Sequence, residues 1–271
     1  MPRTIAIGLT HPGTVRNHDA NAFYLIDTVI TGEPVSDYIS DPVSRGLHSE
    51  LPLQFFALAA GIGGNGVGDQ AACMVLENLG KAVQKIRPGN GTDIRVFVNE
   101  YFQSANQALI KKFGESPEIY AGTSLTLLCL DGYEAWIFAC GDCHCYRLHA
   151  GKLSRLTADA EYEKTSPHRL TNYLGKLHSL PEPKRLALEN GDLFLLATAG
   201  LTGQINAETL EKQLNAPETL TVKPQRLLRL ALQQGTYENL AFVLVRVSDL
   251  AEDDEMKFAE LERKPNFIRH R

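Results

Sequence analysis

The chain has 271 residues, of which 44% are hydrophobic and 22% are charged. A chain of this length and composition can bury a large core without cross-links, so neither global disorder nor a small disulfide-stapled fold is expected. The net charge is −5, with 27 Lys and Arg against 32 Asp and Glu. This balance argues against nonspecific nucleic-acid binding, which needs a basic surface.

The sequence gives no signal for a membrane or for secretion. No apolar run approaches the roughly 18 residues of a membrane span, and the first residues, MPRTIAIGLTHPG, lack the long apolar core of a signal peptide. We therefore expect a cytoplasmic protein with no membrane partner. Cys140, Cys143 and Cys145 crowd around His144, but their spacing differs from that of a paired zinc site. Buried strand cysteines are the favoured interpretation.

The first third of the chain predicts strands that lead to a glycine-rich loop. Apolar residues alternate over residues 5–9, which predicts a strand, and a second strand is expected around residues 23–25. Residues 31–50 are rich in Gly, Pro, Ser and Asp and are expected to form a loop or insertion. The apolar run 53–59 predicts a buried strand, which ends in GIGGNGVG at 61–68. Glycines at such a density allow a tight backbone path.

Two long helices and a series of strands are expected next. Apolar residues recur at the helical period over 69–86 and 93–113. Strands are predicted at 123–130, 134–140, 144–149, 193–198 and 240–247, and further helices at 206–214 and 223–234. Because the strands cluster instead of alternating singly with helices, the order predicts an α+β fold in layers and not a doubly wound parallel sheet.

No shift in composition divides the chain before its last residues. We predict one domain over residues 1–250 and a charged extension over residues 251–271, which begins with an acidic run and ends in RKPNFIRHR. A solvated tail and an arm that binds a partner are both compatible with that sequence.

Four blocks, in chain order, carry a family resemblance. They are residues 13–19; residues 57–64 with 68–71; residues 122–124 with 140–142 and 151–157; and residues 191–202 closed by 237–239. Together they resemble the motifs of the metal-dependent Ser/Thr protein phosphatases of the PP2C (PPM) family. The resemblance implies a PP2C-like four-layer α-β-β-α sandwich, in which two antiparallel sheets are flanked by helices.

The resemblance also implies a site for two divalent ions, which activate water and bind the phosphate. Such ions are held by several carboxylates, one of which bridges them. At the family's carboxylate positions this sequence has Ala60, Ala199 and Gly203. Neither alanine nor glycine offers a side-chain oxygen, so the metal site is expected to be degenerate. Asp142 follows a glycine between two strands and is interpreted as a turn residue.

A few positions of the family's site keep a usable group. The resemblance implies that Arg16 binds the substrate phosphate and that Asp19, Glu238 and the carbonyl of Gly61 are remnants of the metal site. His18 and Asp19 stand where the family has Glu-Asp, in a block that is shorter than usual. No residue is expected to be catalytically active.

These departures lead to a functional hypothesis with two alternatives. The chain is predicted to be a PP2C-like pseudophosphatase, a regulatory or phosphoprotein-binding module in Ser/Thr phosphorylation signalling, with no cofactor and no nucleic-acid partner. The expected partner is a protein, either a phosphoprotein or another component of a kinase pathway. The alternatives are a metal-dependent Ser/Thr phosphatase inactivated by Asp→Ala changes at positions 60 and 199, and a weakly active enzyme with one metal ion. If activity is retained, Mn²⁺ or Mg²⁺ is the expected cofactor.

Overall fold

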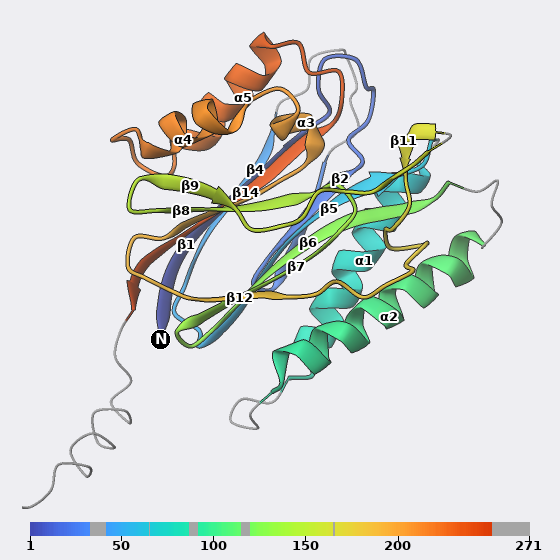
Figure 1. The fold of residues 1–271 in the computed structure, drawn as a ribbon, viewed down its shortest axis with the longest axis horizontal. Helices are drawn as coiled ribbons and strands as arrows, with labels where there is room; N and C mark the ends of the chain where they lie inside the picture. The colour runs from blue at the N-terminus through green and yellow to red at the C-terminus, as the bar shows by residue number, and fades with distance from the viewer. Residues whose placement is uncertain (33–41, 65, 87–91, 115–119, 165, 251–271) are drawn as a thin grey trace, which may run out of the picture.

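Two six-stranded antiparallel sheets pack face to face and carry helices on their outer sides, as Figure 1 shows. This computed structural model describes residues 1–32, 42–64, 66–86, 92–114, 120–164 and 166–250. The arrangement is the predicted α+β sandwich of four layers, α-β-β-α. The predicted charged extension at 251–271 lies outside the described residues.

The two sheets draw their strands from both halves of the chain. The first sheet has the order β4 (Val43–Ser49), β1 (Pro2–His11), β14 (Leu240–Leu250), β13 (Leu193–Ala197), β8 (His144–His149), β9 (Lys152–Arg155). The second has the order β12 (Lys184–Ala187), β7 (Glu134–Cys140), β6 (Gly122–Asp131), β5 (Leu53–Ile62), β2 (Asn21–Leu25), β3 (Thr28–Thr31). A separate hairpin joins β10 (Tyr162–Glu163) to β11 (Ser166–Leu170).

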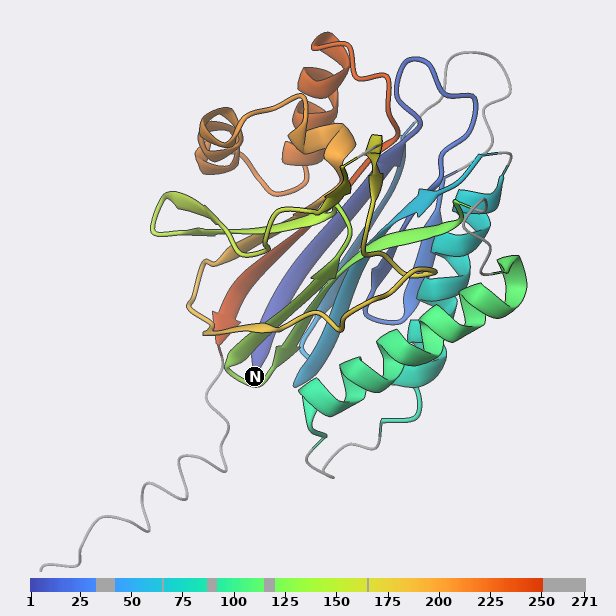
Figure 2. The ribbon, with the colours of Figure 1, turned by 45° about the vertical axis from the view of Figure 1, so that its right-hand side comes forward.

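The helices cover the outer face of each sheet. Figure 2 shows α1 (Val67–Val83) and α2 (Ile94–Phe113) side by side on the second sheet. The first sheet carries α3 (Ala199–Thr202), α4 (Ala207–Asn215) and α5 (Lys223–Gln233). Asp93 caps α2 because its carboxylate accepts a hydrogen bond from the Val96 backbone N–H at 3.1 Å. The two long helices predicted from periodicity and the two further predicted helices are confirmed as α1, α2, α4 and α5.

Each sheet is buried on both faces. In β1, the residues alternate between these two buried faces, so the alternation does not mark a solvent-facing side. Ala6 belongs to the core between the sheets, whereas Ile7 and Leu9 pack on the side of the helices. A Cβ at Gly8 would lie 2.3 Å from the Phe23 ring, so glycine allows the sheets to approach closely there. The alternation in β1 therefore separates two apolar environments.

The expectation of a loop over residues 31–50 is wrong for its second half. Residues 43–49 form β4, which pairs with β1 in antiparallel register from Thr10↔Val43 to Thr4↔Ser49. β4 is an edge strand, and several of its side chains are exposed. An edge strand of this kind needs no continuous apolar run, so its polar composition looked like that of a loop. Residues 33–41 lie outside the described residues.

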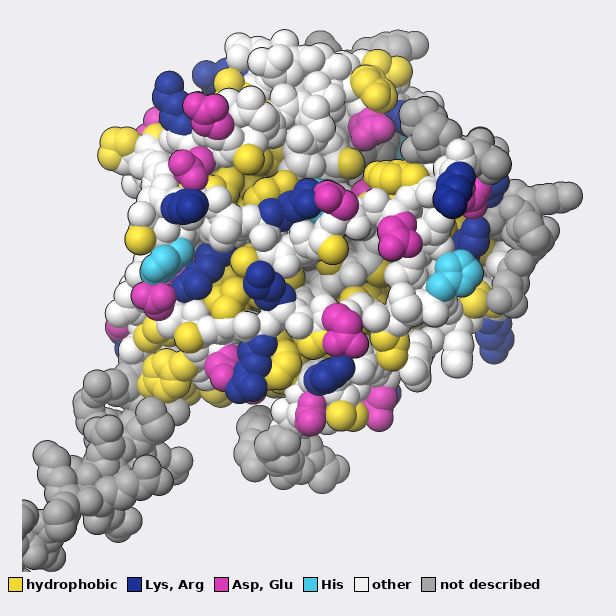
Figure 3. Space-filling view, in the orientation of Figure 1, with side chains coloured by type: hydrophobic (Ala, Val, Ile, Leu, Met, Phe, Trp, Pro, Cys, Tyr) yellow, Lys and Arg dark blue, Asp and Glu magenta, His cyan; other side chains and the backbone are white. Residues whose placement is uncertain are grey.

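The charge distribution on the surface and the length of the helices relate to the predicted absence of nucleic-acid and membrane partners. On the face in view in Figure 3, coloured Lys and Arg side chains are interspersed with Asp and Glu. None of the helices that the structure describes is long and apolar enough to cross a bilayer.

The three clustered cysteines are strand and turn residues of the core. Cys140, Cys143 and Cys145 are buried and unbridged. Burial raises the pKa of the Cys140 thiol to about 12, so it stays protonated at neutral pH.

Candidate functional site

Residues from widely separated parts of the chain meet in a cleft of about 370 Å³. Five predicted site residues line it: Arg16, Ala60, Gly61, Ala199 and Glu238. Three residues that the sequence did not single out as site groups also line it: Asn21, Tyr120 and Asp142. The fold therefore brings together, at one place, residues of the four blocks that carry the family resemblance.

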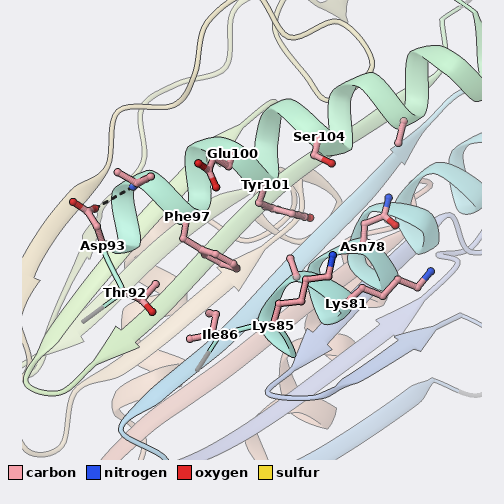
Figure 4. A pocket seen from close by; sticks show the side chains of 13 residues that line it. Asn78, Lys81, Lys85, Ile86, Thr92, Asp93, Phe97, Glu100, Tyr101 and Ser104 are labelled. Carbon is pink, nitrogen blue, oxygen red and sulfur yellow. Dashed lines mark hydrogen bonds between the residues drawn. The ribbon is translucent and has the colours of Figure 1, made fainter. Parts of the chain in front are cut away.

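A larger groove of about 840 Å³ lies between α1 and α2, and Figure 4 shows its side chains. Lys81 of α1 and Lys85, two residues beyond its end, face it, as do Phe97 and Glu100 of α2. Its lining comes from one stretch of chain, residues 78–108, and includes none of the predicted site residues. The smaller cleft is therefore the candidate site, because residues of all four blocks line it.

The strand register sets the row of side chains on one wall of the cleft. Asn21 of β2 lies opposite Ala60 of β5, and Ala60 lies opposite Ser124 of β6. Side chains of directly opposed residues share a face of the sheet. The Ser124 hydroxyl donates to the Asp142 carboxylate at 2.7 Å, which fixes Asp142 beside this row. Asp142 is thus a cleft residue as well as a turn residue.

Asp19 lies apart from the cleft lining and faces a neighbouring cavity. Its carboxyl accepts hydrogen bonds from the Thr10 hydroxyl at 2.5 Å and from the Asn21 backbone N–H at 3.0 Å. Burial raises the pKa of Asp19 to about 6, although these hydrogen bonds oppose the shift. In this structure Asn21, two residues further on, stands at the cleft opposite Ala60. The sequence does not predict that Asn21 lies at the cleft, because this depends on how β2 pairs with β5.

The fourth block places Ala199 at the start of α3. Gly200 follows, and a Cβ there would lie 2.2 Å from the carbonyl oxygen of Asn239. Gly203 ends α3 and is not among the residues that line the cleft. Of the three positions predicted to have lost a ligand, the structure therefore brings two, Ala60 and Ala199, into the cleft.

Asn239 holds the first block in place. Its Nδ2 donates to the carbonyl oxygens of Pro12 and His18, each at 2.8 Å, and its Oδ1 accepts from the Ala20 N–H at 3.1 Å. The neighbouring Glu238 is half-buried and lines the cleft, whereas Arg16 is exposed at the cleft. The loop that carries Arg16 is thus tied to the loop that carries Glu238.

Close backbone packing fixes the glycine-rich block. The Gly61 N–H donates to the Ala20 carbonyl at 2.9 Å, and a Cβ at Gly61 would lie 2.2 Å from the Gly68 carbonyl oxygen. Thr123 donates to the Ala60 carbonyl at 2.9 Å. These contacts require glycine at position 61 and hold residue 60 at the cleft wall.

The groups that line the cleft are a poor set for two divalent ions. Asp142 and Glu238 are its carboxylates, while Asn21, Ala60 and Ala199 are neutral. Within the described ranges, no group of three or more His, Cys, Asp and Glu side chains is placed to hold a metal ion. Hard cations such as Mg²⁺ and Mn²⁺ need several oxygen ligands, usually with carboxylates among them.

A comparison with protein-family models gave no match. The chain is 27% identical over 213 residues to the serine/threonine protein phosphatase PstP of Mycobacterium tuberculosis, which covers 72% of this chain and 41% of PstP. It is 25% identical over 232 residues to the protein phosphatase PhpP of Streptococcus pneumoniae, covering 79% of this chain and 92% of PhpP. The match to PstP thus spans less than half of that protein.

Solved structures show the same fold. The crystal structure of PstP superposes with a TM-score of 0.71 at 21% identity, covering 91% of this chain and 100% of PstP's. A serine/threonine phosphatase of S. agalactiae superposes with a TM-score of 0.72 at 20% identity, covering 90% of this chain and 99% of that one. The PstP catalytic domain was also solved with two manganese ions, with a TM-score of 0.68, 21% identity, and 91% and 100% coverage. This chain has the fold of the PP2C-type Ser/Thr protein phosphatases and is related to them in sequence.

Proposed function

We propose that this chain is a PP2C-like pseudophosphatase, a non-catalytic regulatory module that binds a protein partner in Ser/Thr phosphorylation signalling. The single observation that carries the proposal is the neutral set of side chains at 21, 60 and 199 around the cleft. In two-metal hydrolysis, the ions generate the nucleophilic hydroxide and neutralise the phosphate. Without carboxylates to hold both ions, the cleft cannot carry out hydrolysis by this two-metal mechanism.

The cleft keeps features that suit binding. Arg16 is exposed, and a guanidinium can form paired hydrogen bonds to a phosphate. Val15 and Tyr237, the chain neighbours of Arg16 and Glu238, are 72% and 57% exposed. The Thr14 N–H donates to the Thr236 carbonyl at 3.0 Å, so these two loops lie together. Exposed Tyr, Arg and aliphatic side chains on a fixed platform are typical of protein-binding surfaces.

We therefore propose a phosphoprotein, or another component of a kinase pathway, as the partner, with Arg16 as the residue that contacts phosphate. A cytoplasmic location remains a prediction. A phosphatase disabled only at positions 60 and 199 is the competing proposal. Asn21 argues against it, since it leaves a third neutral side chain at the cleft wall.

The test combines metal binding with catalysis. Calorimetric titration of the purified chain with Mn²⁺ is expected to give no pair of micromolar sites, and a phosphoserine peptide is expected to remain intact in the presence of Mn²⁺. Two ions bound with micromolar affinity, together with steady release of phosphate, would overturn the pseudophosphatase proposal. Hydrolysis that needs one ion and is lost in Glu238→Ala would instead support the weakly active enzyme.

Binding is tested separately. Arg16→Ala is expected to weaken binding of a phosphoserine peptide by about tenfold, the loss expected for a charge-assisted contact. Arg45→Ala is the matched control, because Arg45 is an exposed arginine on the edge strand β4 and does not line the cleft. Equal effects of the two variants would remove Arg16 from the proposed phosphate contact.

A further inference from the structure

A row of paired residues crosses the first sheet on its helix-covered face, and Arg246 interrupts the apolar character of that row. Arg246 of β14 lies opposite Ile5 of β1 and Leu193 of β13. Leu193 lies in turn opposite Leu148 of β8, and both leucines belong to the core beneath α4 and α5. Directly opposed residues share a face of the sheet. A charge placed there costs free energy unless it has a partner, because desolvation disfavours an unpaired ion.

The Arg246 guanidinium has no partner among the residues that the structure describes. Its Nε is buried and makes no hydrogen bond. Nη1 and Nη2 also make none, and neither is closed to solvent in the way that Nε is. None of the ion pairs between described side chains includes Arg246. The two Nη atoms are therefore free to donate hydrogen bonds to a ligand.

A cavity of about 430 Å³ opens beside Arg246. It lies where α4 meets the β8–β9 hairpin (Figure 1), between the hairpin turn at Ala150 and Gly151 and the segment 215–218 at the end of α4. Asn215 Nδ2 donates to the Gly151 carbonyl at 2.7 Å, which joins the two walls. A cavity of this size accommodates a small molecule.

Positive charge predominates behind the wall formed by residues 215–218. Lys223 is only 1% exposed, and its Nζ donates to the Ala216 carbonyl at 2.6 Å. Glu218 is the carboxylate among the residues that line the cavity, and its Oε2 already pairs with Arg226 Nη1 at 2.6 Å. Burial lowers the pKa of Lys223, and so do Arg226 and Arg246, whereas Glu218 opposes the shift. The three cations therefore repel one another, and an anion in the cavity would reduce that repulsion.

We propose that this cavity is a second binding site, which takes the phosphate or carboxylate group of a small molecule on the Arg246 guanidinium. A guanidinium forms paired hydrogen bonds with either group. The site is separate from the cleft: Glu238 and Asn239 precede β14, Arg246 lies in its second half, and no described residue lines both cavities. The inference therefore does not depend on the proposed function.

The experiment measures how oxyanions change the urea midpoint of the full chain, in EDTA and at constant ionic strength with chloride as the balancing anion. The parent chain carries Arg16→Ala, so that phosphate bound in the cleft does not contribute. We expect the midpoint to rise and saturate with inorganic phosphate, because a ligand that binds only the folded state stabilises it. A parallel titration with acetate distinguishes the two ligand groups.

Arg246→Gln is expected to weaken the apparent affinity for phosphate by about tenfold or more. Arg229→Gln is the matched control, because Arg229 is exposed on α5 and does not line the cavity. Arg246→Leu is expected to remove the saturable rise while keeping the midpoint in chloride at or above that of the parent chain, because leucine continues the apolar row. If Arg246→Gln fails to fold, Arg246→Leu decides.

The outcomes separate a specific site from general effects of salt and charge. A saturable rise with only one of the two anions assigns the site to that group, and a rise with both assigns it to oxyanions in general. An equal rise in Arg246→Gln is a general salt effect and overturns the inference. Equal losses in Arg246→Gln and Arg229→Gln also overturn it, since they would show attraction by overall charge. Absence of a saturable rise with either anion overturns the inference and leaves the proposed function of the cleft unaffected.

Discussion

The backbone around the cleft is closely packed, whereas the side chains at two of its predicted ligand positions offer no polar group. The backbone keeps its close contacts: Gly61 against Gly68, Gly200 against the carbonyl of Asn239, and Gly13 against the carbonyl of Glu238. By contrast, the side chains at 60 and 199, which line the cleft, are methyl groups. Shape and chemistry are thus encoded by different residues in the same loops.

This difference teaches that the side chains of the cleft can be changed by mutation without disturbing the backbone contacts that shape it. Backbone contacts hold the two sheets and α1 in register, so their loss would destabilise the whole domain. The methyl groups of Ala60 and Ala199 make no hydrogen bond, so these two side chains can be replaced without breaking one. Three predictions test this separation, each by altering one of the two sets.

The largest effect is expected from restoring carboxylates to the unchanged backbone. The triple variant Asn21→Asp, Ala60→Asp, Ala199→Asp should gain at least about a thousandfold in Mn²⁺ affinity, or about 4 kcal/mol, because it rebuilds the anionic oxygens that hard cations prefer. Calorimetric titration with Mn²⁺ measures it. The double variant at 60 and 199 is the control and should gain much less. Equal gains in the two variants would show that Asn21 is not a missing ligand position.

A smaller but still severe effect is expected from disturbing the backbone. A Cβ at Gly61 would lie 2.2 Å from the Gly68 carbonyl oxygen, so Gly61→Ala must push β5 away from α1. We expect a loss of about 3 kcal/mol or more in the free energy of unfolding. Urea denaturation followed by circular dichroism measures it.

Gly64 is the matched control in the same block. A Cβ at Gly64 would meet no atom within 4 Å, and the residue has no positive φ. Gly64→Ala is therefore expected to change the free energy of unfolding by less than about 1 kcal/mol. Similar losses in both variants would mean that the close contact at Gly61 is not what fixes the loop.

The same division explains what the sequence could predict. Glycine spacing and apolar periodicity predicted β5, α1 and α2, because local conformation and burial leave a pattern in neighbouring residues. The position of Asn21 opposite Ala60 depends on how β2 pairs with β5, and no local pattern records that register. The sequence therefore predicts Asp19 as the remnant of the first block, whereas the structure places its side chain toward Thr10.

Two other residues of the cleft could not be predicted from the sequence, for a related reason. Asp142 lies between β7 and β8 and looked like a turn residue, and only its hydrogen bond to Ser124 on β6 places it at the cleft. Tyr120 also lines the cleft, but nothing in its local sequence distinguishes it. Contacts between residues far apart in the chain decide both positions.

The smallest predicted effect tests whether Asp19 belongs to the framework rather than to the site chemistry. Its pKa is raised by burial from 3.8 to about 6, so the folded state favours the protonated carboxyl. The stability that protonation provides is present at acid pH and is lost as the pH rises through about 6. Between pH 5 and pH 7 this group alone should lower the free energy of unfolding by about 1 kcal/mol.

Asp19→Asn isolates this contribution. His18, Asp69, Glu77 and Lys112 line the same cavity and are present in both proteins, so the difference between the two pH profiles reports Asp19. The difference, measured by urea denaturation from pH 5 to pH 7, is expected to grow in favour of the variant as the pH rises. If the variant also leaves phosphopeptide affinity unchanged, Asp19 serves the framework. If affinity changes as much as in Arg16→Ala, Asp19 acts at the cleft and the separation of backbone from chemistry fails at this loop.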